Sequence, residues 1–365
     1  MSHVIDFLSY HPIYGIDNTS MEQWSLDCEK EWNILSNILL KSKDAMLFDT
    51  FIDAYNDLAK KASQQVFSSI VWSMDDRKKS VEYLLNAPQV EQRTESWYTE
   101  AQRMLTASQF STILQTGRTR GHLVVEKALG NTDTSQRKTV VFTSDLNPFT
   151  WGIRFEPIVN QIYCHLTNTV VKDMGRLKHR TDTRLAASPD GMVISGPEER
   201  YGRFVEFKAP ITRELIKIVP KDYIVQMQIQ MEVGNVQECD YLEVKFISAN
   251  GTKTPEIPEG TYYGELFVIG IDDTPKRYMY SPLNTKGWIP SLEPGEIIYE
   301  TVPWVTNAFY LTTVGRSPSW FASVQPAIES FWKDVELARK GEFILPESSR
   351  KKKDIVCRII DDNQL

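Results

Sequence analysis

One apolar strand that contains two charged residues constrains this chain more than any other segment. Residues 203–211, RFVEFKAPI, have the apolar pattern of a short buried β-strand, but Glu206 and Lys208 interrupt it. Side chains alternate faces along a strand, so Glu206 and Lys208 share one face and Phe207 lies on the other. Charges are costly to bury unless they are paired or bound to a metal. This strand is therefore the first candidate for a functional site.

The segments around this strand predict an α/β core. A helix is expected at 147–168, followed by strands at 169–177, 184–195 and 201–211, a helix at 221–235, strands at 240–249 and 262–272, and a late helix at 319–343. Pro157 is tolerable in the first of these helices if it falls in the first turn. This order predicts a mixed central β-sheet flanked by helices.

The chain before this core has the pattern of amphipathic helices. They are expected at 21–40, 47–62 and 75–86, and a further helix with a break near Thr106-Ala107-Ser108 is expected at 92–114. We predict an N-terminal helical region (1–90), a second domain (91–345) and a polar C-terminal tail (346–365).

Composition limits the functional classes. The net charge of −7 argues against a protein that coats nucleic acid through bulk charge, although a local basic groove remains compatible with it. No apolar run of about 18 residues and no secretory signal is present, so we expect an intracellular protein that is not secreted and has no membrane span. The four cysteines are scattered: Cys28, Cys164, Cys239 and Cys357. Without CxxC spacing they are expected to be thiols in a reducing compartment.

Three other enzyme classes lack their motifs. The five histidines show no HxxxH spacing, which argues against a His-based zinc hydrolase. The segment GRTRG at 117–121 lacks the GxxxxGK[ST] pattern of an NTPase, and no GxSxG nucleophile elbow is present.

A second carboxylate completes a possible metal site. Asp190 follows Pro189 and precedes Gly191 in a turn-forming segment, and fifteen residues separate it from Glu206. If the two strands pair as a hairpin, Asp190 comes beside Glu206, and two close carboxylates repel unless a cation lies between them. Mg²⁺ takes oxygen ligands and keeps several waters. Lys208 would then hold or deprotonate a water, or stabilise phosphate charge, so these residues suit metal-assisted phosphodiester hydrolysis.

This arrangement resembles a known nuclease signature. Pro189-Asp190 followed by Glu206-Phe207-Lys208 is similar to the motif of the PD-(D/E)XK nucleases. The ordered blocks RTESWYTEAQRMLTAS, WGIRFEPIV, SPDG, EFKAP and YIVQMQIQM resemble the branch of phage lambda exonuclease and the YqaJ-type viral recombinases. The late helix resembles versions from large DNA viruses. The resemblance covers about residues 91–340 and implies a PD-(D/E)XK core with an added N-terminal helical region.

The resemblance implies roles for matching positions in the centre of the site. Asp190 and Glu206 would be metal ligands, together with the main-chain carbonyl of Phe207. Lys208 would be the catalytic lysine, and Gln226 would orient the water or the lysine. The ion would be Mg²⁺, with Mn²⁺ as a substitute.

The resemblance also implies residues at the periphery of the site. Glu156 would approach the metal through water, and the alternative is that it is a helix-surface carboxylate. Arg103, Ser108 and Ser188 would bind a 5′-phosphate, a role that suits an arginine fork and short hydroxyl donors. The chain departs from the pattern where Met104-Leu105 replaces a small residue. The family's further DNA-binding basic residue is matched only by Arg213.

Three hypotheses follow. The first is a Mg²⁺-dependent exonuclease that acts 5′→3′ on linear duplex DNA in viral recombination, replication or repair, in the host cytoplasm or nucleus. By resemblance, such a protein would pair with a single-strand annealing protein and form a homotrimer. The second is a related endonuclease or an RNA-degrading nuclease. The third is a non-catalytic DNA- or protein-binding module, which is disfavoured because the set of charged residues is complete.

Overall fold

The computed structural model describes residues 72–130, 148–248, 256–272 and 274–347. The main sheet comprises β2 (Val170–Lys172), β5 (Gly191–Ser195), β6 (Phe204–Lys208), β7 (Glu238–Ser248), β8 (Tyr263–Ile271), β9 (Thr274–Tyr280) and β10 (Ile297–Gly315). A smaller sheet comprises β1 (Leu105–Thr106), β3 (Leu177–Lys178) and β4 (Leu185–Ala187). The helices are α4 (Met74–Asn86), α5 (Glu95–Ala101), the 3₁₀ helix η1 (Ala107–Gln109), α6 (Phe110–Ile113), α7 (Arg118–Leu129), α8 (Pro148–Thr167), α9 (Lys221–Gly234) and α10 (Pro318–Arg339).

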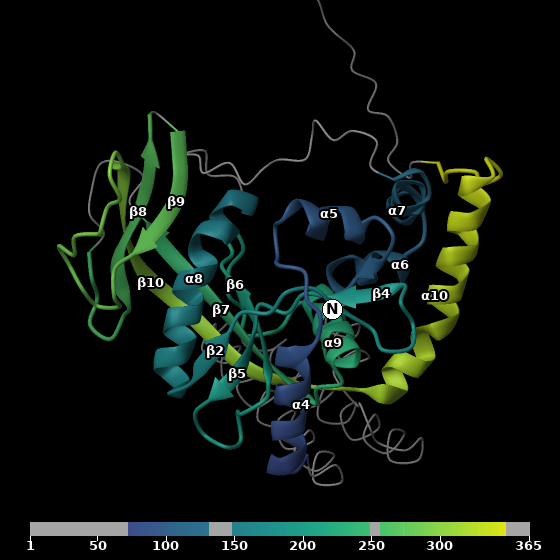
Figure 1. Ribbon diagram of the computed structural model, residues 1–365, viewed down its shortest axis with the longest axis horizontal. Coiled ribbons are helices and arrows are strands. Elements are labelled where there is room, and N and C mark those ends of the chain that lie inside the picture. The colour runs from purple at the N-terminus through teal and green to yellow at the C-terminus, as the bar shows by residue number, and fades with distance from the viewer. Residues whose placement is uncertain (1–71, 131–147, 249–255, 273, 348–365) are drawn as a thin grey trace, which may run out of the picture.

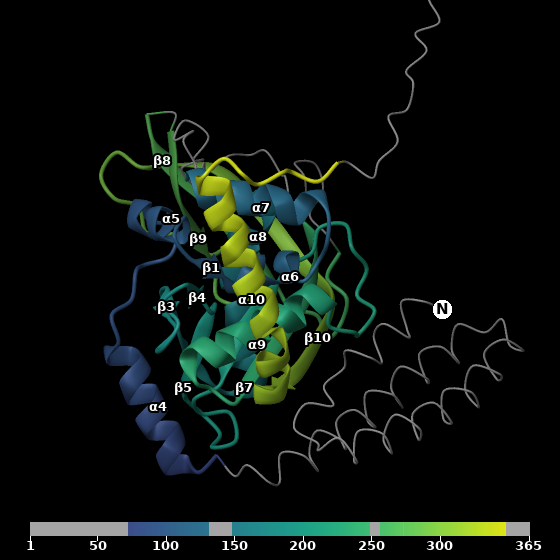
Figure 2. The same ribbon diagram turned by 90° about the vertical axis from the view of Figure 1, so that its right-hand side faces the viewer.

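The main sheet is mixed, with strand order β2-β5-β6-β7-β10-β8-β9. β5 and β6 form an antiparallel pair with Gly191 opposite Val205. β6 and β7 run parallel with Phe207 beside Leu242, and α9 makes the crossover between them. Helix α8 covers one face of the sheet and α9 covers the other (Figure 1). Figure 2 shows α10 lying over α9 and reaching α7. The predicted mixed sheet flanked by helices is therefore confirmed.

Strand β6 divides the apolar core into two clusters. Val205 and Phe207 pack on the α8 side, and Phe204 packs on the α9 side. Glu206, which follows the same alternation as Phe204, is directed toward α9 and is 0% exposed. The expected separation of Glu206 and Phe207 onto opposite faces is correct.

The expected strand boundaries are corrected at two places. The strand expected at 169–177 is divided into β2 and β3, and the one expected at 184–195 is divided into β4 and β5, which belong to different sheets. The second division falls at Ser188–Asp190, where Pro189 has no N–H to donate to a ladder. The sheet breaks there, and Asp190 is placed at the start of β5.

Two strands and one helix position differ from expectation. No strand was expected at β9 or β10, and β10 contains Pro303 and two register shifts that obscure its alternation. Pro157 lies inside α8 and not in its first turn. A proline there removes one helical hydrogen bond, but α8 buries Phe155, Ile158 and other apolar residues fully, and this packing holds the helix together.

The helix expected at 92–114 is broken more extensively than at Thr106-Ala107-Ser108. It is divided into α5, β1, η1 and α6. The helix expected at 75–86 is confirmed as α4, which contributes Val81 and Leu84 to the core. The helices expected at 21–40 and 47–62, and nearly all of the expected tail, lie outside the described residues. The division into domains stays a prediction.

Two further expectations concern the described part only. Cys164 and Cys239, the two cysteines within it, are free thiols. No helix among the described residues has the length and apolar character needed to span a membrane.

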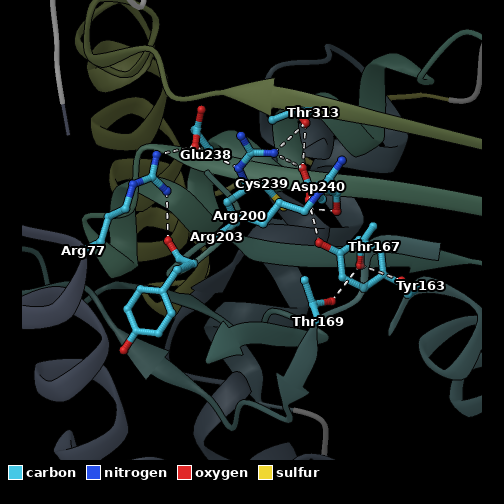
Figure 3. A network of polar contacts seen from close by, with 11 residues as sticks. Arg77, Tyr163, Thr167, Thr169, Arg200, Arg203, Glu238, Cys239, Asp240 and Thr313 are labelled. Carbon is cyan, nitrogen blue, oxygen red and sulfur yellow. Dashed lines mark hydrogen bonds and ion pairs between the residues drawn. The ribbon is translucent and has the colours of Figure 1, made fainter. Parts of the chain in front are cut away.

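A buried carboxylate fixes β7 to its neighbours (Figure 3). Asp240 is 0% exposed and accepts hydrogen bonds from the Tyr163 hydroxyl at 2.6 Å and the Thr313 hydroxyl at 2.7 Å. Arg203 Nη1 donates to it at 3.0 Å, and Arg200 also forms an ion pair with it. The donors come from α8, β10 and the β5–β6 connection, so one acidic side chain links three parts of the fold.

The same network reaches α4. Arg203 Nε donates to Glu238 at 2.9 Å, and Arg77 Nη2 donates to the same carboxylate oxygen at 3.0 Å. Arg77 Nη1 also donates to the carbonyl of Tyr201 at 2.9 Å. These bonds attach α4 to the start of β7 and to the β5–β6 connection.

Replacing Asp240 tests the contribution of this network. We expect Asp240→Asn to lower the free energy of unfolding by about 3 kcal/mol, because Arg200 and Arg203 lose a buried anionic partner. Denaturant unfolding measures the change, with Asp272→Asn on the exposed β8–β9 turn as the matched control. A loss no larger than that of the control would contradict the role given to Asp240.

Candidate active site

Glu206 is the buried centre of the candidate site. Its Oε1 accepts a hydrogen bond from Gln226 Nε2 at 2.7 Å and contacts Lys208 Nζ, while its Oε2 accepts from Gln230 Nε2 at 2.6 Å. Gln226 and Gln230 are one turn apart on α9, so both amides reach the same strand. Three donors therefore hold the carboxylate in one orientation and leave lone-pair capacity on it.

Gln230 was missed in the sequence, where only Gln226 was expected at the site. The signal was present in QMQIQ, because residues four apart share a helix face. Gln228, between them, lies on another face and donates to the carbonyl of Gly315 at 2.6 Å. The carbonyl oxygen of the buried Gln230 side chain has no hydrogen-bond partner among the described residues.

Lys208 remains positively charged in this environment. Burial disfavours its ammonium, but the negative charges of Glu206 and Asp190 outweigh that effect and raise the pKa of Lys208. Its Nζ also lies 4.8 Å from the ring centroid of Tyr223. As an ammonium, Lys208 is a donor to a water or a phosphate oxygen.

Asp190 reaches the same site from the start of β5. Its Oδ2 accepts a hydrogen bond from the backbone N–H of Phe207 at 2.6 Å, as the predicted hairpin arrangement requires. Burial raises the pKa of Asp190 well above its usual range, and the charges of Glu206 and Glu156 act in the same direction. An ionised Asp190 is thus disfavoured here unless a cation compensates it.

Glu156 faces the site from α8. Its Oε2 lies 2.6 Å from Arg93 Nη2, and both side chains are about one-third exposed. Burial raises the pKa of Glu156, while Arg93 and Lys208 oppose this rise. The negative charge of Glu206 acts on the pKa of Glu156 in the same direction as burial.

A cleft of about 470 Å³ opens beside these residues. It is lined by Gln89, Glu91, Gln92, Arg93, Glu156, Pro157, Asn160, Asp173, Met174, Gly175, Asp190 and Phe207. The two acids Asp190 and Glu156 thus face one open volume, which gives a ligand access to the site.

The donor set fits a hard divalent cation that keeps part of its water. The described residues contain no group of three His, Cys, Asp or Glu side chains arranged to hold a metal. Asp190 accepts one hydrogen bond and Glu206 three contacts, so both keep free acceptor capacity. Two carboxylates, a carbonyl and waters are a ligand set that Mg²⁺ takes and zinc does not favour.

The predicted phosphate residues are only partly brought together. β1 and β4 pair in parallel with Thr106 beside Ala186, which brings the segment ending at Ser108 alongside the one ending at Ser188. Ser188 Oγ accepts from Trp97 Nε1 at 3.0 Å, and Ser108 is exposed. Arg103 is exposed between α5 and β1.

Arg213 lies apart from those residues. It forms an ion pair with the buried Glu243, which is beside Lys208 in the β6–β7 register. Its guanidinium lies 5.6 Å from the Tyr223 ring centroid, next to the same ring that Lys208 faces. Glu214 points elsewhere and pairs with Lys245 at 2.7 Å. Arg213 is therefore on the lysine side of the site.

The fold brings the residues of the predicted signature together. In a mixed sheet with helices on both faces, Asp190 at the start of β5 meets Glu206 and Lys208 on the neighbouring strand β6, as the resemblance to the PD-(D/E)XK signature predicts. Residues 91–237 match the family model of the YqaJ-like viral recombinase domain, so the resemblance predicted from the motifs is confirmed for this part of the chain.

Individual proteins resemble the chain more distantly. Uncharacterized protein R354 of Acanthamoeba polyphaga mimivirus is 23% identical over 315 residues, which are 72% of this chain and 56% of that protein. The chain thus spans about half the length of this relative, whose source agrees with the expected likeness to large DNA viruses.

Two solved structures match part of the chain at low identity. An alkaline exonuclease (LHK-Exo) from Laribacter hongkongensis matches with a TM-score of 0.41 and 20% identity, over 68% of this chain and 95% of its own. A phage-related exonuclease from Haemophilus somnus 129PT matches with a TM-score of 0.34 and 11% identity, over 65% of this chain and 92% of its own.

The charge arrangement predicts that Asp190 destabilises the metal-free protein. Folding raises the pKa of the Asp190 carboxyl. At pH values above the pKa of this carboxyl in the unfolded chain, its ionisation therefore favours the unfolded state. We expect Asp190→Asn to raise the free energy of unfolding in EDTA by on the order of 1 kcal/mol. The amide oxygen can still accept from Phe207 N–H.

Thermal unfolding with EDTA and with Mg²⁺ measures this effect. Mg²⁺ should raise the melting temperature of the unsubstituted protein, since a ligand of the folded state stabilises it, and should have little effect on the variant. A less stable variant that still responds to Mg²⁺ would contradict the assignment of Asp190.

Proposed function

We propose that this protein is a Mg²⁺-dependent nuclease that hydrolyses the phosphodiester bonds of linear duplex DNA from its ends. The observation that carries the proposal is the convergence of Asp190 and Glu206 with a charged Lys208 at the edge of a cleft. The match of residues 91–237 to the viral recombinase domain supports the same activity.

The roles follow from the hydrogen bonds of the site. Asp190, Glu206 and the main-chain carbonyl of Phe207 would hold the ion, for which Mn²⁺ can substitute. A bound ion lowers the pKa of a coordinated water and offsets charge on the phosphate. Lys208, as an ammonium, donates to the attacking water or to a non-bridging oxygen. Gln226 donates to Glu206 and keeps its carboxylate aimed at the ion.

A second group of residues would select the DNA end. Arg103, Ser108 and Ser188 would bind a 5′-phosphate, which fixes the direction of digestion as 5′→3′, and Arg213 would contact the strand beyond the catalytic lysine. Parallel pairing of β1 with β4 supports this by bringing two of the three segments together. Glu156 would act through water, and its position at the cleft favours this over a purely surface role.

The biological setting is proposed on the same basis. The match to a viral recombinase domain supports a role in viral DNA recombination, replication or repair. We further propose, from the resemblance of the motifs alone, a single-strand annealing protein as partner and a homotrimer as the assembly. The helical region of residues 1–90 would be an addition to the nuclease domain at 91–345. Endonuclease, RNA-degrading and non-catalytic binding functions are the alternatives that the next two experiments separate.

The first experiment removes the ammonium of Lys208. We expect Lys208→Ala to lower Mg²⁺-dependent degradation of linear duplex by about 10²–10³-fold, because the donor to the reacting water or phosphate is lost. End-labelled linear DNA, closed circular DNA and RNA are incubated with Mg²⁺ or EDTA, and Lys286→Ala, an exposed lysine far along the chain, is the control. Cleavage of circular DNA would favour an endonuclease, and undiminished activity of the variant would refute the mechanism.

The second experiment tests end recognition. We expect Arg103→Ala to slow digestion of 5′-phosphorylated ends about tenfold more than that of 5′-hydroxyl ends, because one charged hydrogen bond to phosphate is lost. Initial rates on matched duplexes give the comparison. An equal loss on both ends would argue against the 5′-phosphate pocket.

A further inference from the structure

The cleft beside the catalytic residues is acidic, with one exception. Four of the residues that line it are acids: Glu91, Glu156, Asp173 and Asp190. Arg93 is the only basic residue among the described residues of this lining. A phosphodiester that enters the cleft meets repulsion from the acids unless cationic groups compensate it. A metal ion held by Asp190 would compensate the negative charge at one side of the cleft. At the other side, the positive charge comes from the Arg93 side chain.

The partner of Arg93 is one that a substrate can replace. Arg93 Nη2 donates to Glu156 Oε2 at 2.6 Å, and the two side chains are 34% and 31% exposed. Ion pairs that remain open to solvent contribute little to stability, so exchange for another anion is inexpensive. A guanidinium has five N–H donors in a planar fork that suits a phosphate. The Arg93 guanidinium therefore suits a ligand that offers more acceptor oxygens than the Glu156 carboxylate does.

The position of Arg93 is fixed by the residue before it. Gln92 Nε2 donates to the carbonyl of Met174 at 2.8 Å and to the carbonyl of Pro189 at 3.1 Å. Pro189 directly precedes Asp190, so the Gln92 amide couples the backbone of Arg93 to that of the proposed metal ligand. The arginine is thus positioned relative to the catalytic centre.

The backbone conformation supports a functional role for this side chain. Arg93 has φ = 68°, in the left-handed region that glycine or asparagine adopts at less cost than arginine. Conformations of this kind cluster at ligand-binding and catalytic sites. The chain therefore has an arginine at a position whose backbone conformation glycine would adopt at lower energetic cost.

We propose that Arg93 is a phosphate-binding residue of the active-site cleft, held by Glu156 in the free protein and transferred to a backbone phosphate of the nucleic acid on binding. This rests on the proposed nuclease function but assigns a contact outside the residues already given to the metal and the 5′-phosphate. Glu156 is released by the same exchange and no longer holds the guanidinium.

The test is equilibrium DNA binding without turnover. A fluorescein-labelled duplex of about 20 base pairs, one that spans a site of this size, is titrated with full-length Lys208→Ala protein in Mg²⁺ at several salt concentrations. Adding Arg93→Gln should weaken binding several-fold and reduce the slope of log K against log salt by about 0.9, the value for one phosphate contact. Arg277→Gln, an arginine that is 37% exposed and paired with Glu296 at 2.7 Å, is the matched control and should change neither quantity.

A second comparison distinguishes phosphate contact from simple support of Glu156. Glu156→Gln removes a negative charge and frees the arginine, so it should tighten DNA binding, and Arg93→Gln should still weaken binding in that background. Arg93→Lys should keep the salt slope, because the charge is retained, with part of the affinity lost. An Arg93→Gln variant with no effect in the Glu156→Gln background overturns the proposal, since Arg93 would then act only through its partner.

The outcomes separate this inference from the proposed function. If the Lys208→Ala protein binds duplex DNA and Arg93→Gln changes neither affinity nor salt slope, the role of Arg93 is refuted and the nuclease function stands. If that protein binds neither duplex nor single-stranded DNA, both fail.

Discussion

The site depends on one buried carboxylate, Glu206, which the fold holds on an apolar strand. A charge in that position is stable only if donors surround it, and Lys208, Gln226 and Gln230 supply them. Glu206 faces α9, which supplies the two amides, while the next residue, Phe207, packs on the α8 side. Two adjacent residues of β6 therefore constrain the positions of the two helices.

Asp240, buried in the sheet, and Asp190, beside the cleft, differ in how their negative charge is compensated. Asp240 accepts from two hydroxyl groups and pairs with two arginines, which makes it a structural anion that joins separate elements. Asp190 accepts from a single backbone N–H and lies near two other acids, so its negative charge is left undercompensated. The protein thus places strong charge compensation away from the cleft and leaves a deficit of positive charge at the cleft, the place of the proposed metal ion and of Arg93.

The sequence predicted most of the centre of the site and much of the surrounding fold. Strand alternation and turn chemistry were sufficient to bring Asp190, Glu206 and Lys208 together, because a hairpin and a period of two leave little freedom. β9 and β10 were missed, because Pro303 and the register shifts of β10 remove the alternation that identifies a strand. Gln230 was missed although its spacing from Gln226 was visible, and the pairing of Arg93 with Glu156 has no local signal at all.

The sequence by itself determined the chemical groups of this protein and which face of a strand or helix each one occupies, because these follow from covalent geometry and local periodicity. Only the tertiary structure decided which of those faces meet. The break at Pro189, the crossover of α9 and the approach of α8 bring together segments as far apart as Arg93 and Gln230. The charge state of Lys208 and the acidity of the cleft depend on these long-range contacts, since electrostatic energies are set by distance and burial in the folded protein.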